Sequence, residues 1–293
     1  MKRHSLIYHI STFAVIISVV VACTEKAEFP LESTYVRLVV DGEINTDTTV
    51  HRVKLSCSGD ALNEHPGNKI SGAIVSIYDG SNNFSLHENP ETPGVYETDS
   101  TVYGVPGKTY TLQISNVDID GDGNNEEYSA SSYLPLINPI DSIKVSYQQL
   151  GPQYKGWIIN MYAQEIGGGR NFYLVKAWKN NVLLTDSAYE CASFADNTGF
   201  EGSYYNGFSV YYLNYNKLDE RLVDGDVVTL EMDGITQQYK DFLVGFISEY
   251  QPKVPIFSGP SANIPTNIEP HDKAVGFFTA YCAMRKSRVY RGE

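Results

Sequence analysis

The residues with the clearest chemical pattern are the acidic groups that begin at Asp118. Asp118, Asp120 and Asp122 alternate with other residues, and Gly123 follows them. This spacing matches the first part of a calcium-binding loop, which has carboxylates at positions 1, 3 and 5 and glycine at position 6. Glu126 falls at position 9, where a ligand often acts through water. The sequence therefore predicts a Ca²⁺ site formed by Asp118, Asp120, Asp122 and Glu126.

A second interpretation of the same segment needs no metal. Position 12 of a calcium loop is normally a bidentate Glu, and here it is Ser129. Asp and Gly are also favoured at a solvent-exposed hairpin tip, because they tolerate tight turns. The sequence leaves open whether this loop binds calcium or is an acidic, solvated hairpin tip.

Aromatic residues concentrate between residues 204 and 215. Those predicted to contact a ligand or partner are Tyr204, Tyr205, Tyr211 and Tyr212, with Phe208 and Tyr215 beside them. Aromatic rings stack on sugar rings and anchor protein interfaces, since they offer a large contact area with few rotatable bonds. The alternative is that alternate members of the stretch 211–215 are core residues of a strand.

Sequence signatures of known catalytic sites are missing. There is no Gly-x-Ser-x-Gly and no His-Glu-x-x-His, and the pair His87-Glu88 lacks the second histidine. Gly107-Lys108-Thr109 lacks the first glycine and the helix of a phosphate-binding loop. We therefore predict that the protein is not an enzyme. A hydrolase remains an alternative, because catalytic triads are spatial and not sequential.

The first 23 residues resemble a lipoprotein signal. Lys2 and Arg3 precede an uncharged run over residues 10–21, which is too short for a membrane span. The run ends in Val20-Val21-Ala22-Cys23, which resembles a lipobox. The prediction is a signal peptide over 1–22, an acylated Cys23 and a polar tether over 23–32. An ordinary signal peptide with a chance cysteine is the alternative.

The charge balance limits the partners. The formal net charge is −13, and removal of Lys2 and Arg3 with the signal would make it more negative. Nucleic-acid binding is excluded, because it requires clustered Lys and Arg. We expect attachment to the bilayer through lipid and not through a basic face. The other cysteines, Cys57, Cys191 and Cys282, allow three free thiols or one disulfide.

Short alternating stretches bounded by turn residues fill the first half of the chain. The predicted strands are residues 35–40, 50–57, 73–78, 83–86, 94–98, 109–115 and 127–134. Asp41-Gly42 and Asp79-Gly80 are predicted to end strands. This spacing is typical of an antiparallel sandwich, so residues 33–137 should form an immunoglobulin-like or transthyretin-like domain.

A composition change at Pro135 to Pro139 predicts a boundary, with a second β-rich domain over 138–293. Its predicted strands are residues 140–147, 156–164, 171–179, 182–185, 227–232 and 274–284. Asn180-Asn181 reads as a hairpin turn, and Asp233-Gly234 as a strand end. Apolar residues at intervals of three and four predict one amphipathic helix over about 235–250. The predicted fold class is mainly β.

Several short segments follow one another in a characteristic order along the chain. They are the lipobox, Leu38 to Ile44, Val53 to Ser56, Gly72 to Ile77, Gly94 to Tyr96, Gly107 to Leu112, Pro265 to Ile268 and Ala274 to Ala280. Together they resemble the Bacteroidetes outer-membrane lipoprotein family catalogued as domain of unknown function 4249. The resemblance covers nearly the whole mature chain. The insert over 118–127 departs from the plainer hairpin of the family.

The resemblance implies an outer-membrane lipoprotein, often encoded beside a TonB-dependent transporter, with no catalytic residues to transfer. The expected function is a lipid-anchored accessory or binding protein that works with such a transporter in nutrient uptake. The alternative is a structural or adhesive cell-surface sandwich protein. The stretch 24–28 does not decide between the periplasmic face and the cell surface.

Overall fold

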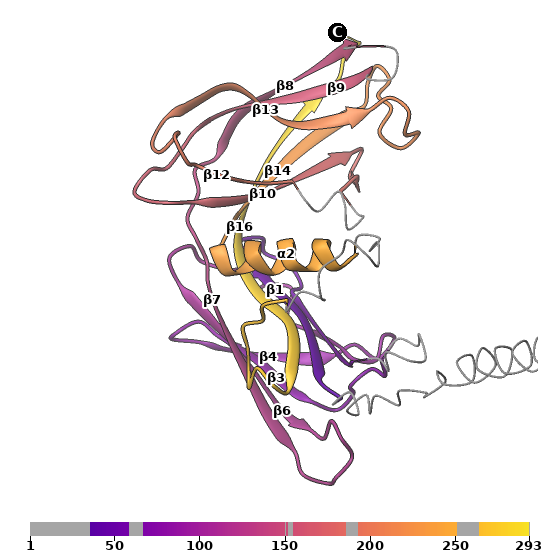
Figure 1. The fold of residues 1–293 in the computed structure, drawn as a ribbon, viewed down its shortest axis with the longest axis vertical. Coiled ribbons are helices and arrows are strands. Elements are labelled where there is room, and N and C mark those ends of the chain that lie inside the picture. The colour runs from indigo at the N-terminus through magenta and orange to yellow at the C-terminus, as the bar shows by residue number, and fades with distance from the viewer. Residues whose placement is uncertain are drawn as a thin grey trace, which may run out of the picture. The chain divides into compact units, whose positions relative to one another are not determined.

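The computed structural model describes residues 36–58, 67–149, 151, 155–185, 193–250 and 264–292. The predicted signal peptide, Cys23, the tether and Cys191 lie outside the described residues. The chain from Val36 onward groups into one compact unit. Strands make up most of the described part, which contains a single helix (Figure 1). The predicted mainly-β fold is therefore confirmed.

The strands follow one another closely along the chain. The first seven are β1 (Leu38–Asn45), β2 (Arg52–Cys57), β3 (Ile74–Tyr78), β4 (Asn83–Glu88), β5 (Val95–Glu97), β6 (Thr109–Val117) and β7 (Glu126–Tyr133). The next seven are β8 (Ile140–Gln149), β9 (Lys155–Gln164), β10 (Phe172–Lys179), β11 (Val182–Leu183), β12 (Phe194–Asp196), β13 (Tyr204–Asn214) and β14 (Val227–Ile235). Helix α2 (Gln237–Tyr250), β15 (Ile268–Glu269) and β16 (Ala274–Val289) complete the described elements.

One long sheet connects the two halves of the sequence. Its strand order is β11-β10-β14-β16-β1-β2-β5-β4-β3-β6-β7-β15, and β12 pairs with β10. Residues 274–281 of β16 pair in parallel with β1, and residues 282–289 pair antiparallel with β14. A second sheet has the order β13-β9-β8. The predicted domain boundary between residues 137 and 138 stays a prediction. Strand β16 pairs with β1 from the first half of the chain and with β14 from the second.

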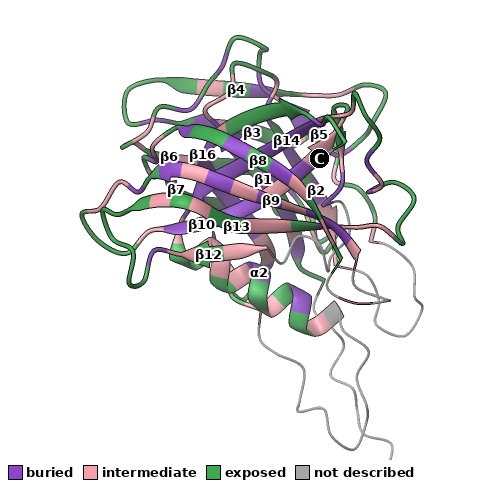
Figure 2. Ribbon diagram, turned by 90° about the horizontal axis from the view of Figure 1, so that it is seen from above, coloured by how far each residue is buried: buried purple, intermediate pink, exposed green. Residues whose placement is uncertain are grey.

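The core is one continuous cluster of apolar side chains drawn from both halves. Leu38, Leu55 and Leu112 are fully buried, and Ile159 and Leu230 belong to the same cluster. Along strands such as β6, buried residues alternate with exposed ones, as Figure 2 shows by colour. This period of two is the reason that the sequence pattern predicted strands.

Helix α2 packs on a smaller cluster on one face of the long sheet. Its Leu243 lies against Phe172, Ile235 and Tyr281. The hydroxyl of Thr236 accepts a hydrogen bond from the backbone N–H of Tyr239 at 3.2 Å, so Thr236 is the N-cap. The helix predicted over about 235–250 is confirmed, and it begins at Gln237 because Ile235 ends β14 and pairs with Phe172.

Two predicted strand ends are also wrong. Asp41-Gly42 lies inside β1 and Asp233-Gly234 inside β14. At Gly42 a Cβ would lie 3.1 Å from Val53 Cγ2, so the glycine serves close packing and not a turn. The pair Asp79-Gly80 does follow the end of β3, and Gly80 has a φ of 91°.

Other differences concern strand lengths. The first strand runs over Leu38–Asn45 and not over 35–40, and β16 continues to Val289. The aromatic stretch, for which the sequence offered a strand only over 211–215, contains the longer strand β13. The hairpin turn at Asn180-Asn181 is confirmed, with φ values of 51° and 66° between paired strands β10 and β11.

Candidate functional site

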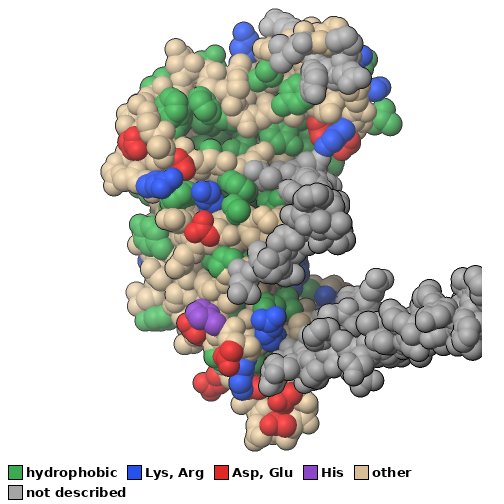
Figure 3. Space-filling view, in the orientation of Figure 1, with side chains coloured by type: hydrophobic (Ala, Val, Ile, Leu, Met, Phe, Trp, Pro, Cys, Tyr) green, Lys and Arg blue, Asp and Glu red, His purple; other side chains and the backbone are tan. Residues whose placement is uncertain are grey.

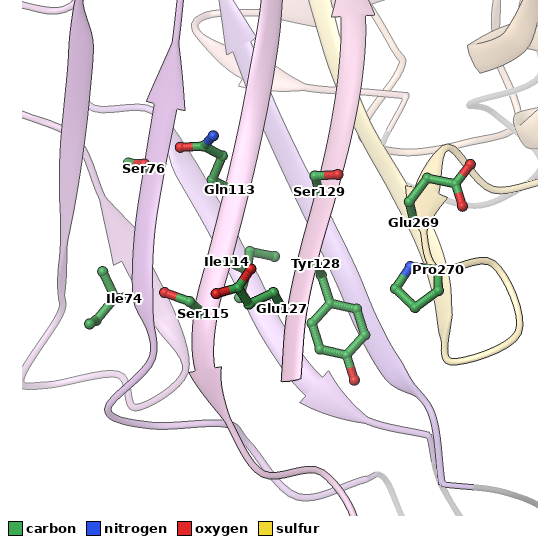
Figure 4. Close-up of a pocket in the computed structure, with 10 residues that line it drawn as sticks. All are labelled: Ile74, Ser76, Gln113, Ile114, Ser115, Glu127, Tyr128, Ser129, Glu269 and Pro270. Atoms are coloured by element: carbon green, nitrogen blue, oxygen red, sulfur yellow. The ribbon is translucent and has the colours of Figure 1, made fainter. Parts of the chain in front are cut away.

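The outward-facing surface of β3, β6 and β7, named here the outer face, carries a groove of about 640 Å³. The lining residues, drawn in Figure 4, are Ile74, Ser76, Gln113, Ile114, Ser115, Glu127, Tyr128, Ser129, Glu269 and Pro270. Three strands supply the floor, and the segment at β15 supplies one wall. The groove is therefore built on regular backbone, which holds side chains more rigidly than loops do.

A row of polar side chains crosses the groove. Ser76 pairs with Gln113, Gln113 with Ser129, and Ser129 with Glu269. Figure 4 shows these four side chains in line across the strands. Because neighbouring strands lie about 4.8 Å apart, the row is about 14 Å long. That length and chemistry fit an extended ligand with several hydrogen-bonding groups.

The wall at β15 is fixed by buried and polar contacts. Ile268 is fully buried. The side-chain amide of Asn267 donates to the carbonyls of Ser131 at 3.1 Å and Phe278 at 2.7 Å. Glu269 Oε1 lies 2.9 Å from Nε2 of His271, and both side chains are more than half exposed. The segment thus presents a carboxylate and an imidazole together at the rim.

Two inward-facing side chains form the base at one end of the groove. Ile114 and Tyr128 pair with each other across β6 and β7 and are buried. Burial raises the pKa of Tyr128 to about 12, with a further contribution from the negative charge of Glu126. Its hydroxyl has no hydrogen-bond partner among the described residues. This ring is a structural support below the exposed polar row.

A second pocket of about 450 Å³ lies beside the groove and shares Ser129 and Glu269 with it. Helix α2 supplies Gln238 and Asp241 to its lining, and β16 supplies Phe277. Carboxylates therefore occur in both pockets, whereas no Lys or Arg among the described residues lines either of them. The combined site favours neutral or basic ligands over anions.

The structure brings the three predicted calcium aspartates together. Asp118, Asp120 and Asp122 are exposed at the tip between β6 and β7, and one ligand atom of each lies within 4.8 Å of the others. Figure 3 shows acidic side chains gathered at this tip. Asp118 accepts hydrogen bonds from the N–H groups of Gly121 at 2.8 Å and Gly123 at 3.0 Å. Its carboxylate thus orders the turn.

The fourth predicted ligand is held differently. Glu126 accepts a hydrogen bond from the N–H of Ile119 at 3.3 Å and lies 3.4 Å from Lys273 Nζ. Ser129, at position 12, is a strand residue opposite Gln113. Hydrogen bonds from Asn124 lower the pKa of Asp122. The three aspartates offer oxygen ligands of the type that Ca²⁺ prefers, and the calcium site stays a prediction.

The predicted tyrosine cluster is divided between the surface and the core. Tyr204 is 50% exposed and Tyr212 is 38% exposed. Tyr205, Tyr211 and Tyr215 are half-buried and pack against the main core. The Tyr215 ring stacks on Trp157, with centroids 5.9 Å apart. Tyr211 and Tyr215 therefore fit the interpretation as core residues, and a binding role for the exposed Tyr204 and Tyr212 stays a prediction.

Irregularities in β13 create a second aromatic surface. Register shifts between Asn206 and Phe208 place Tyr205 and Phe208 on the same side of the strand, opposite Ala163 and Met161. With Phe200 they form a three-ring cluster with centroids 5.6–5.9 Å apart. Phe200 and Phe208 are each over 40% exposed. This aromatic edge cluster (Phe200, Tyr205, Phe208) is a candidate contact surface.

The described cysteines are free thiols. Cys57 lies at the end of β2 and Cys282 within β16, and burial raises the pKa of both thiols. In the part of the chain that the structure describes, no helix has the length and apolar character needed to cross a bilayer.

A comparison with protein families gives one assignment. The model described as Domain of unknown function (DUF4249) matches residues 24–287. This chain belongs to that family. The resemblance inferred from the sequence is therefore confirmed, and the match begins immediately after Cys23. Among curated proteins no relative was found.

The groove residues have no sequence motif, because they come from strands far apart in the chain. A weaker signal was present. The outward positions of β6 and β7 include Thr111, Gln113, Ser115, Ser129 and Ser131, which are small or uncharged polar residues. Solvated sheet faces usually carry charges of both signs. In a strand with alternating apolar and polar residues, polar positions without Lys or Arg are therefore a sequence signal for a binding face.

Proposed function

We propose that this protein is a lipid-anchored accessory binding protein of the outer membrane, which works with a TonB-dependent transporter in nutrient uptake. The observation that carries the proposal is the outer-face groove, whose row of Ser76, Gln113, Ser129 and Glu269 offers hydrogen bonds along about 14 Å. Ligand capture needs such a preformed site. Acylation of Cys23 would hold that site close to the membrane.

The proposal makes the protein a binding component and not an enzyme. A rigid groove lets the protein bind a nutrient with little ordering cost. A bilayer tether keeps the captured nutrient near the transporter and raises its effective concentration there. The negative net charge of the chain fits attachment by lipid.

Two measurements test the proposal. After detergent solubilisation of the outer membrane, the tagged protein should co-purify with a TonB-dependent transporter. The variant Cys23→Ser should lose incorporation of a fatty-acid probe and leave the membrane fraction. Recovery of the protein alone contradicts the partnership with a transporter, and label retained on Cys23→Ser contradicts the lipid attachment.

A second candidate function is a structural or adhesive surface protein. The aromatic edge cluster favours it, because half-exposed rings at a sheet edge are suited to protein contacts. Gene neighbours separate the two candidates. An adjacent transporter gene favours uptake, and adjacent fimbrial or secretion genes favour adhesion.

A further inference from the structure

The outer face differs in composition from the exposed positions on β1, β2 and β5 of the same long sheet. Its outward positions are Ile74, Ser76, Tyr78, Thr109, Thr111, Gln113, Ser115, Glu127, Ser129, Ser131 and Tyr133. Glu127 is the charged residue in this set. On β1, β2 and β5, by contrast, Lys54 pairs with Asp41 at 2.9 Å and Arg52 with Glu97 at 2.7 Å. Contact with water does not explain why the outer face lacks such ion pairs, because solvated protein surfaces usually carry charges of both signs.

The polar groups in the groove are available to a ligand. Among the described residues, the side chains of Ser76, Gln113 and Ser129 make no hydrogen bond to another protein group. In the neighbouring row, Thr111 and Ser131 are less available, because their Oγ1 and Oγ atoms lie 3.1 Å apart and bond to each other. A hydroxyl or amide can both donate and accept. Such groups match the hydroxyls of a sugar, which also do both.

Exposed tyrosines lie on the same face. Tyr78 is 40% exposed and pairs with Thr111, and Tyr133 is 48% exposed and pairs with Thr109. The hydroxyl of Tyr78 donates to the carbonyl of Gly80 at 2.6 Å, which restrains the ring. A restrained, half-exposed ring provides an apolar platform for the C–H face of a pyranose at low entropic cost.

The charges that line the groove exclude one class of sugar. Glu127 and Glu269 line the groove, and in the described part of the chain no Lys or Arg lines it. Sulfated or uronic-acid chains would bring negative charge against these carboxylates, which is unfavourable. A neutral chain meets no such repulsion, and its hydroxyls can donate to the carboxylates.

We infer that the outer face binds a neutral oligosaccharide, which extends across β3, β6, β7 and β15 along the row from Ser76 to Glu269. This inference rests on the proposed function, because it names the ligand class of the same groove. The polar row contacts the sugar hydroxyls, and Tyr78, one row away opposite Thr111, offers a stacking surface. Binding leaves the glycosidic bonds intact.

The experiment uses the full-length protein in a detergent without a sugar head group. Titration calorimetry is performed with maltohexaose, cellohexaose, laminarihexaose, xylohexaose and mannohexaose, and with a chondroitin sulfate oligosaccharide as the anionic probe. We expect binding of at least one neutral probe and none of the sulfated probe. Mass spectrometry after incubation should recover the bound probe unchanged.

Three variants localise the binding. Gln113→Ala should weaken it about threefold to tenfold, as expected for the loss of one hydrogen-bonding side chain. Ser129→Arg should abolish it by filling the middle of the row. Ser142→Arg, an exposed position on β8, is the matched control and should bind like the parent protein. Thermal melting verifies that all three are folded.

The inference is overturned if no neutral probe binds at millimolar concentration, if Ser129→Arg binds normally, or if Ser142→Arg weakens binding equally. Cleavage of the probe would overturn the binding-only role. These outcomes are separate from the proposed function. Co-purification with a transporter but no sugar binding rejects the ligand class alone, whereas sugar binding without any transporter rejects the partnership alone.

Discussion

Two of the Asp-Gly dipeptides in this chain, Asp79-Gly80 and Asp233-Gly234, have opposite structural roles. Asp79-Gly80 forms the turn after β3, and Asp233-Gly234 lies inside β14. Each aspartate meets a lysine, with Asp79 2.8 Å from Lys108 and Asp233 2.6 Å from Lys176. The two Asp–Lys distances are similar, but the hydrogen-bonding groups around the two aspartates differ.

The hydrogen bonds around the two aspartates explain the difference. Burial of Asp79 is outweighed by bonds from Lys108, Asn82 and Ser81, which lower its pKa. Burial dominates at Asp233 and raises its pKa to about 7 despite Lys176. Asp233 Oδ1 has no partner among the described residues, and Lys176 is shared with Glu231 at 3.1 Å. A single ion pair does not replace full hydrogen bonding in the interior.

A third buried carboxylate, Glu165, sharpens this comparison because it has several donors and no lysine. Burial opposes its ionisation, but bonds from Gly202, Asn171, Tyr173 and Gly167 lower its pKa to about 2. Asn197 adds a bond of 2.9 Å. The substitution Glu165→Ala leaves these donors unpaired, including those of the buried Tyr173 and Asn197, so we expect a loss of about 3–5 kcal/mol.

Chemical denaturation of the full-length protein measures this loss as the change in unfolding free energy. Glu201→Ala is the control, since Glu201 is an exposed acidic residue in the same region. A loss below about 1 kcal/mol for Glu165→Ala would contradict the role of full hydrogen bonding.

The pH dependence of stability tests Asp233. Its pKa is about 7 in the folded state against 3.8 for the ordinary group, so folding is favoured by protonation. Its contribution is complete below about pH 4 and is lost as pH rises through 7. We expect Asp233→Asn to flatten the decline in stability between pH 4 and pH 7.

For Asp79, the aspartate at the turn, the expected pH dependence of stability has the opposite sign. The folded-state pKa of Asp79 is lowered, so its contribution is present above pH 4 and is lost in acid. Asp79→Asn should therefore lower stability by a constant amount from pH 5 to pH 8 and remove this group's part of the decline in acid. Melting temperatures measured across pH for both variants decide this. Identical profiles for Asp233→Asn and the parent would reject the burial argument.

The two glycines should respond differently to alanine. A Cβ at Gly234 would lie 2.5 Å from Ile137 Cγ2, whereas a Cβ at Gly80 meets nothing within 4 Å. Gly234→Ala should cost about 1–3 kcal/mol through overpacking. Gly80→Ala should cost about 1 kcal/mol, because its φ of 91° is strained for a residue with a side chain.

A double variant confirms the cause. Ile137→Ala removes the atom that would clash, so adding Gly234→Ala to that background should destabilise much less than in the parent. The same background should not change the effect of Gly80→Ala. Additive effects of Ile137→Ala and Gly234→Ala would rule out the clash.

Calcium binding by Asp118, Asp120 and Asp122 gives the smallest expected effect. These carboxylates are exposed, so repulsion among them is screened by water and salt. Calcium at a few times a Kd of about 10⁻⁴–10⁻³ M should stabilise the protein by about 1 kcal/mol. Thermal melts with calcium, with a chelator and with sodium at equal ionic strength measure it. If the melting curves with calcium and with chelator coincide, and Asp120→Asn changes neither, the loop is only a solvated hairpin tip.

The sequence by itself determined the family, the mainly-β class, most strand positions and the single helix in the described part. These follow from local patterns: an alternation with period two, apolar spacing of three and four, and turn pairs such as Asn180-Asn181 with positive φ. It also determined that Asp118, Asp120 and Asp122 come together, because they are neighbours on one loop.

Only the tertiary structure decided the rest. Gly80 turns the chain and Gly234 admits Ile137, but nothing local to either dipeptide distinguishes them. The division of the tyrosines depends on bulges in β13. The row from Ser76 to Glu269 exists because strand register aligns residues nearly 200 positions apart, and register is set by the buried faces and not by the exposed residues that form the site.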